Sequence, residues 1–216
     1  MSDFHTTLPT ADSIVYTLDM VGIIACTVAA SVLAKRLQFD AFGALMISFI
    51  GSVGGGTLRD VLLNRHPIFW LHDHNYLYTI CIVSFLVQIF YHYIEKLDRA
   101  MRWFDALGLA AFTVIGIEAA LARNMGAPIV ILMGVFTAVI GGVLRDIVCR
   151  QIPLVLQKEI YITASIIGST YYLLLSHTDI SAWFRSITTI LLIFVIRMLA
   201  IYRQWNLPNI TLPKRH

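Results

Sequence analysis

Long runs of apolar residues divide the chain into seven stretches separated by short polar segments. A helix that crosses the ~30 Å hydrocarbon core of a bilayer needs roughly 20 such residues. The runs are continuously apolar, whereas strands of a membrane barrel alternate apolar and polar positions. The pattern therefore predicts an all-α integral membrane protein with seven transmembrane helices. They are expected at about 14–34, 41–63, 76–94, 104–122, 127–149, 158–176 and 183–202.

Composition agrees with a membrane protein. Of the 216 residues, 58% are hydrophobic and 13% are charged, whereas soluble domains average about 45–50% and 25%. The connections are too short to hold a soluble domain, so residues 1–216 are expected to form a single transmembrane domain. The basic residues are spread over the loops, and nucleic acid is therefore not an expected partner. Cys26, Cys81 and Cys149 lie in three different apolar stretches, which indicates no disulfide framework.

The distribution of Lys and Arg predicts the orientation of the chain. With the N-terminus outside, the inner loops and tail carry ten basic residues and the outer loops carry three. Cytoplasmic loops are enriched in Lys and Arg, so we expect the N-terminus outside and the C-terminus in the cytoplasm. The inner residues are Lys35, Arg36, Lys96, Arg99, Arg102, Arg150, Lys158, Arg203, Lys214 and Arg215, and the outer ones are Arg65, Arg123 and Arg185.

The chain contains an internal repeat. Residues 19–67 align without a gap to residues 105–153, with 14 identities in 49 positions. The first unit covers about 14–94 and the second about 104–176, and the helix at about 183–202 stands outside both. Because each unit contains three predicted helices, the second unit must enter the membrane from the opposite side. We therefore expect an inverted 3+3 repeat plus a seventh helix.

Glycine clusters lie inside two of the apolar stretches, at Gly54-Gly55-Gly56 and at Gly141-Gly142. Glycine in a membrane helix commonly serves close packing. Consecutive glycines also weaken a helix, and irregular backbone is tolerated at this depth where it lines an aqueous cavity. The clusters are interpreted as kinks or unwound turns beside a path through the protein.

Each glycine cluster is followed by an Arg-Asp pair, and each unit supplies one further aspartate. Snorkelling to headgroups would be the simplest account of such charges, but charges within membrane segments usually face a cavity. The inverted repeat places one cluster near each membrane face, as gate or pore charges. Because adjacent helical residues point in different directions, pairing of Arg59 with Asp19 and of Arg145 with Asp105 is expected. The six residues are Arg59, Asp60, Arg145, Asp146, Asp19 and Asp105.

Other polar residues within the apolar stretches are candidates for the wall of the path. Serine and threonine in membrane helices often bond to their own backbone instead, and structural pairing is the preferred interpretation for Glu118 and Arg197. No nucleophile–base pair, phosphate loop or metal-ligand spacing is visible, so neither an enzyme nor a metal site is expected. The wall candidates are Ser48, Ser52, Thr57, Thr137 and Glu118.

The paired Gly-Gly-x-x-Arg-Asp motifs, the repeat and the additional helix resemble bacterial members of the trimeric intracellular cation (TRIC) channel family, also described as glycine-transporter-like membrane proteins. The resemblance implies a homotrimer in the bacterial inner membrane, with one pore in each protomer. It also implies that the second and fifth predicted helices, at about 41–63 and 127–149, line this pore. Their kink positions would be Gly54, Gly55, Gly56, Gly141 and Gly142.

Two functions are compatible with these features. The resemblance favours a channel that conducts monovalent cations, potassium or sodium, without a cofactor. The alternative is a secondary carrier for glycine or another small zwitterion, because an inverted repeat suits alternating access equally well. A channel needs only weak contacts along a continuous path, and the sequence does not separate the two.

Overall fold

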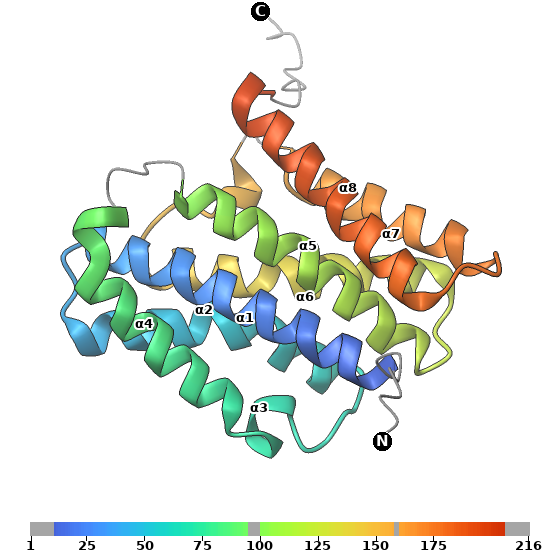
Figure 1. The fold of residues 1–216 in the computed structure, drawn as a ribbon, viewed down its shortest axis with the longest axis horizontal. Coiled ribbons are helices and arrows are strands. Elements are labelled where there is room, and N and C mark those ends of the chain that lie inside the picture. Colours follow the sequence, from blue (N-terminus) through green and yellow to red (C-terminus); the bar gives the residue numbers. More distant parts are fainter. Residues whose placement is uncertain (1–10, 95–99, 158–159, 206–216) are drawn as a thin grey trace, which may run out of the picture.

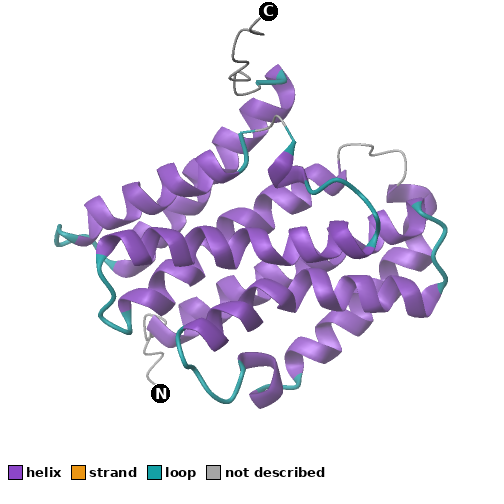
Figure 2. Cartoon of the chain, turned by 180° about the vertical axis from the view of Figure 1, so that it is seen from behind, coloured by secondary structure: helices purple, strands orange, loops and turns teal. Residues whose placement is uncertain are grey.

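The computed structural model of the protein describes residues 11–94, 100–157 and 160–205. Over these ranges the chain forms eight α-helices and one turn of 3-10 helix, and it contains no strand (Figure 2). The protein is therefore all-α, as the apolar pattern predicted. The elements are α1 (Ala11–Arg36), α2 (Ala41–Leu62), α3 (Phe69–His72), α4 (Asn75–Ile94), α5 (Ala100–Leu121), α6 (Ala127–Val148), η1 (Leu154–Leu156), α7 (Ile162–Ser176) and α8 (Ala182–Arg203).

Each predicted span contains a helix, but within the described ranges only six helices are long and apolar enough to cross a membrane: α1, α2, α4, α5, α6 and α8. Helix α7 has 15 residues, so it covers roughly 22 Å at 1.5 Å per residue. The predicted span began at residue 158, which lies outside the described residues. Five basic residues used to predict the orientation also lie outside them: Lys96, Arg99, Lys158, Lys214 and Arg215.

Helices α1 and α5 form the centre of the bundle and pack side by side (Figure 1). About three quarters of their membrane-length windows are buried, 72% and 78%, whereas the other long helices reach at most 44%. Small side chains explain the close approach, because Gly22 faces Phe112 and Gly108 faces Cys26 across this contact. The two central helices thus hold the first half of the chain against the second.

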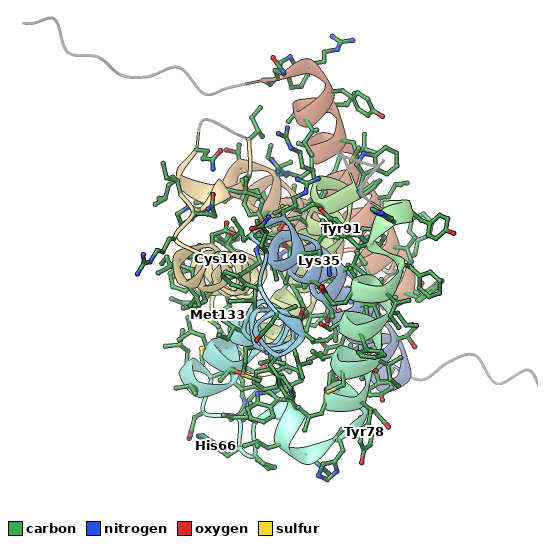
Figure 3. All side chains as sticks on the ribbon, turned by 90° about the vertical axis from the view of Figure 1, so that its left-hand side faces the viewer. Lys35, His66, Tyr78, Tyr91, Met133 and Cys149 are labelled. Atoms are coloured by element: carbon green, nitrogen blue, oxygen red, sulfur yellow. The ribbon has the colours of Figure 1, made fainter. Side chains whose placement is uncertain are left out.

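The remaining helices surround this pair. Helix α4 packs against α1 and α2, and α8 packs against α5 and α7. Helices α2 and α6 pack against each other and lie behind α1 and α5 in Figure 1. Figure 3 looks along the bundle from one end and shows Lys35, next to the end of α1, near Cys149, which follows α6.

Helices α2 and α6 end in the same way. Beyond each helix one non-glycine residue has left-handed backbone, Asn64 with φ 49° and Arg150 with φ 54°. The next N–H, of Arg65 or Gln151, returns to the carbonyl of Asp60 at 2.7 Å or of Asp146 at 2.8 Å. This reversal satisfies carbonyl groups of the last turn. It also directs the chain into α3 after α2 and into η1 after α6.

Candidate functional site

Helices α2 and α6 cross with their backbones in direct contact. A Cβ atom built on Gly55 would overlap the carbonyl oxygen of Thr137, and one built on Gly141 would overlap the carbonyl oxygen of Gly51. The Cβ position of Gly54 lies 3.5 Å from the Cα atom of Gly141. The crossing is antiparallel, and glycine is required there because no side chain fits.

Both helices continue through their glycine clusters, since α2 is helical over Ala41–Leu62 and α6 over Ala127–Val148. The unwound turn that was one interpretation of the glycines is therefore absent from α2 and α6 in this structure. The close approach of two backbones explains the loss of side chains without any loss of helical hydrogen bonds. A bend at these positions stays a prediction.

The Arg-Asp pair of α6 lies in a buried charge cluster at one end of the crossing. The Nε atom of Arg145 lies 2.8 Å from Oδ1 of Asp146, and Nη1 lies 3.1 Å from Oδ1 of Asp105. All three side chains are at most 4% exposed. The predicted pairing of Arg145 with Asp105 is therefore present. Arg145 Nη2 and Asp105 Oδ2 have no hydrogen-bond partner in the described part of the chain.

The Arg-Asp pair of α2 forms a similar cluster at the other end, with different partners. Arg59 Nε lies 2.8 Å from Oδ1 of Asp60, and its guanidinium lies 5.3 Å from the centre of the Phe69 ring. Asp19 accepts a hydrogen bond of 2.8 Å from the hydroxyl of Tyr76. Among the described residues Arg59 has no ion pair with Asp19, so the pairing predicted from the repeat holds in the second half only. Both arginines bond their sequence neighbour, so the two ends differ in the other aspartate, which at this end is bonded by Tyr76.

The aspartate of each pair also anchors the loop that follows its helix. Asp60 Oδ2 accepts the backbone N–H of Phe69 at 3.0 Å, and Asp146 Oδ2 accepts that of Leu154 at 3.2 Å. A buried carboxylate with charged and backbone donors is satisfied on both oxygens. The Arg-Asp motif therefore fixes the loop at each end of the crossing, in addition to placing charge there.

The four candidate wall hydroxyls all have protein partners. Ser48 donates to Ser84 at 3.2 Å, and Ser52 lies 2.8 Å from the hydroxyl of Thr27. Thr57 and Thr137 each donate to a backbone carbonyl of their own helix, at 2.8 and 2.7 Å. Thr57 also accepts a bond of 3.0 Å from the Trp70 indole. In this conformation the hydroxyls of Ser48, Ser52 and Thr57 join α2 to other helices, and that of Thr137 bonds within α6.

Glu118 lies away from the crossing. Its carboxylate accepts a hydrogen bond from the hydroxyl of Tyr172 on α7, and the Arg185 guanidinium lies 5.4 Å from the centre of the Tyr172 ring. This contact joins α5 to α7 and α8, and it is the structural pairing preferred for Glu118.

A narrow space lies beside Arg145, and it is too small to hold a water molecule. Its lining includes Gly142, Arg145, Asp146 and Tyr161. A Cβ atom on Gly142 would lie 3.7 Å from Arg145 Nη2 and 3.8 Å from the Tyr161 hydroxyl. The space is thus bordered by polar atoms that can bind a small polar species if it widens.

Three aromatic residues next to the clusters were not expected from the sequence: Phe69, Tyr76 and Tyr161. Each lies at or just before the start of a helix that follows an Arg-Asp loop. For the two tyrosines the available signal was a hydroxyl beside an apolar run, since a buried tyrosine hydroxyl requires a partner. In the part of the chain that the structure describes, no three His, Cys, Asp or Glu side chains cluster as metal ligands would.

Comparison with known proteins places this arrangement among bacterial membrane proteins. A family model described as "Glycine transporter" matches residues 16–92 and again residues 102–177. The chain is 38% identical to a UPF0126 membrane protein of Vibrio cholerae serotype O1, covering 98% of this chain and 88% of the relative. It is 35% identical to the UPF0126 inner membrane protein YadS of Escherichia coli K12, covering 92% and 97%.

Solved structures with the same fold are cation channels. The TRIC channel orthologue from Rhodobacter sphaeroides is 32% identical, with a TM-score of 0.85 over 88% of this chain and 98% of that chain. A prokaryotic TRIC channel crystallised in potassium chloride is 30% identical, with a TM-score of 0.84 over 90% and 98%.

Proposed function

Because the chain belongs to the TRIC channel family, we propose that it is a monovalent cation channel, permeable to potassium, with a path beside the α2–α6 crossing in each protomer. The observation that carries this proposal is the buried charge cluster at each end of the crossing. Charged groups within a membrane usually mark an ion or substrate path. Potassium or sodium would be the permeant ion, and the function needs no cofactor.

The described conformation fits a closed state of such a channel. The backbones of α2 and α6 are in contact at Gly55 and Gly141, and the space beside Arg145 is too small for a water molecule. Opening then requires the two helices, or the loops held by Asp60 and Asp146, to change position. Gly54, Gly56 and Gly142 would allow a bend in each helix because they lack side chains.

We further propose seven spans with an inverted 3+3 repeat, a homotrimeric assembly and an inner-membrane location with the N-terminus outside. The repeat is supported by the family model that matches both halves of the chain. It is also supported by the equivalent ends of α2 and α6 and by the antiparallel crossing. Relatives named as a trimeric channel and as an inner membrane protein support the assembly and the location. The orientation rests on the distribution of Lys and Arg.

A carrier for glycine or another small zwitterion is the second candidate. The observation that favours it is two buried atoms of oppositely charged groups, Arg145 Nη2 and Asp105 Oδ2, that have no hydrogen-bond partner among the described residues. These atoms could bind the carboxylate and the ammonium of a zwitterion. The name of the matching family model agrees with this chemistry.

Recording from purified protein in planar bilayers tests the channel. Discrete potassium currents are expected from the wild-type chain. Arg145→Gln should change open probability or conductance because it removes the charge between Asp105 and Asp146, whereas Arg145→Lys keeps that charge. Arg203→Gln is the matched control, since Arg203 lies at the exposed end of α8 beside Trp205. Silence in bilayers together with saturable glycine uptake by proteoliposomes would establish the carrier instead.

A further inference from the structure

The two buried charge clusters obtain their second positive charge from different places. At the Arg59 end, Arg65 Nη1 lies 3.8 Å from Oδ1 of Asp60, and the Arg65 side chain is 43% exposed. Asp60 therefore lies between two guanidinium groups, the buried one of Arg59 and that of Arg65, which reaches solvent.

At the Arg145 end the second positive charge is buried. Arg197 of α8 is 1% exposed. Its Nη1 donates to the carbonyl of Ile160 at 2.9 Å, and its guanidinium lies 4.5 Å from the centre of the Tyr161 ring. Tyr161 also lines the narrow space beside Arg145, so Arg197 lies next to this cluster. Arg197 is thus a buried charge held by the contact between α8 and the loop before α7.

The repeat shows which residue of the second half stands at the position equivalent to Arg65. With the offset of 86 positions, Arg65 corresponds to Gln151. Both N–H groups bond to the carbonyl of the preceding aspartate, at 2.7 Å for Arg65 and 2.8 Å for Gln151. The Gln151 side chain is uncharged, and its amide donates to the carbonyl of Cys149 at 3.4 Å. Only the Arg59 end carries a charged side chain at this equivalent position.

We infer that Arg65 is a removable counter-charge that sets the net charge, and hence the cation conductance, of the mouth at the Arg59 end. This rests on the proposed channel function. At 3.8 Å the Arg65–Asp60 pair is longer than a hydrogen bond, and a pair with an exposed partner is weak. When Arg65 moves into solvent, this mouth loses one positive charge beside Asp60, which raises the local concentration of cations.

Single-channel recording of Arg65→Gln tests the inference. Conductance for cations that enter at the Arg59 end should rise roughly two- to tenfold at low salt. The difference should disappear near 1 M salt, where the Debye length is about 3 Å. Arg65→Lys keeps the charge and should behave as the wild type. Arg123→Gln is the matched control, because Arg123 is an exposed arginine at the same end that bonds the carbonyl of Asn64 at 3.1 Å.

Equal conductance of wild type and Arg65→Gln, or an equal rise in Arg123→Gln, would overturn the inference.

A second measurement does not depend on current, so it separates this failure from failure of the channel proposal. The melting temperature of the purified protein in detergent should rise more steeply with potassium concentration in Arg65→Gln than in Arg65→Lys or Arg123→Gln. If the wild type passes no current but this salt dependence is found, the channel proposal fails and the counter-charge stands. Identical salt dependence in all three variants would refute the counter-charge.

Discussion

Asp60 and Asp146 each bind two different groups, the guanidinium of the preceding arginine and a backbone N–H of the following loop. The two interactions use different carboxylate oxygens, so a single side chain connects the end of a helix, a buried charge and a loop. An amide at this position would offer only one acceptor oxygen and no charge. The aspartate is therefore the least replaceable residue of the motif.

Asp146→Asn should destabilise the protein by about 3 kcal/mol or more, because it leaves Arg145 buried with one carboxylate partner. Thermal or denaturant unfolding in detergent measures the change. Asp40→Asn is the control: Asp40 caps α2 through the N–H of Gly43 at 2.7 Å, and asparagine caps a helix equally well. Similar losses in both variants would show that the ion pair of Asp146 adds little.

The sequence located the charges of both clusters but only part of their pairing. The Arg145–Asp105 contact followed from the repeat and from the helix geometry. The Tyr76–Asp19 hydrogen bond did not, because it joins α1 to α4 across 57 positions of the chain. Which donor bonds a buried carboxylate depends on how the helices pack, and the pattern of residues in one sequence does not reveal this packing.

Among the elements, α2 and α6 have the closest contact. Their glycines were interpreted as kinks or unwound turns, and in the structure Gly55 and Gly141 are points of backbone contact between intact helices. Both interpretations require residues without side chains, so the sequence pattern alone could not distinguish them. The space next to a glycine depends on the position of the partner helix, which is known only from the packed structure.

Two neighbouring glycines of α6 provide a test of this contact. Gly141→Ala should destabilise the protein or force α2 and α6 apart, because its Cβ would overlap the carbonyl oxygen of Gly51. Gly142→Ala meets its nearest atom only at 3.7 Å, and alanine favours a helix by up to about 1 kcal/mol over glycine. Unfolding measurements should therefore show a loss for Gly141→Ala and a small change or a gain for Gly142→Ala. Equal losses would contradict the backbone contact.

The arrangement of the whole molecule was predictable in outline. The apolar runs located the helices because a membrane span must satisfy its backbone internally and match the bilayer thickness. The central position of α1 and α5 was not predicted, although their runs of small residues are typical of close helix packing. The short α7 was also not foreseen, since the predicted span began at residue 158 and α7 begins at Ile162.

Labelling of single cysteines tests the proposed orientation. Arg123→Cys and Arg150→Cys place thiols at exposed positions beyond the two opposite ends of α6. The background has Cys26, Cys81 and Cys149 changed to alanine. A membrane-impermeant maleimide should label Arg123→Cys in intact cells. It should label Arg150→Cys only after permeabilisation, because the loop after α6 is expected in the cytoplasm. The cysteine-free background is the control, and the reverse pattern would contradict the proposed orientation.

The contact between α2 and α6 has a consequence for the origin of the chain. Gly55 meets Thr137 while Gly141 meets Gly51, and the offset of the repeat makes these two contacts equivalent. Position i of one half meets position j of the other, and j meets i, which defines an isologous interface between identical subunits. A half-length ancestor would already have carried both sides of this interface. Two copies inserted in opposite directions could have paired through it before gene fusion joined them into one chain.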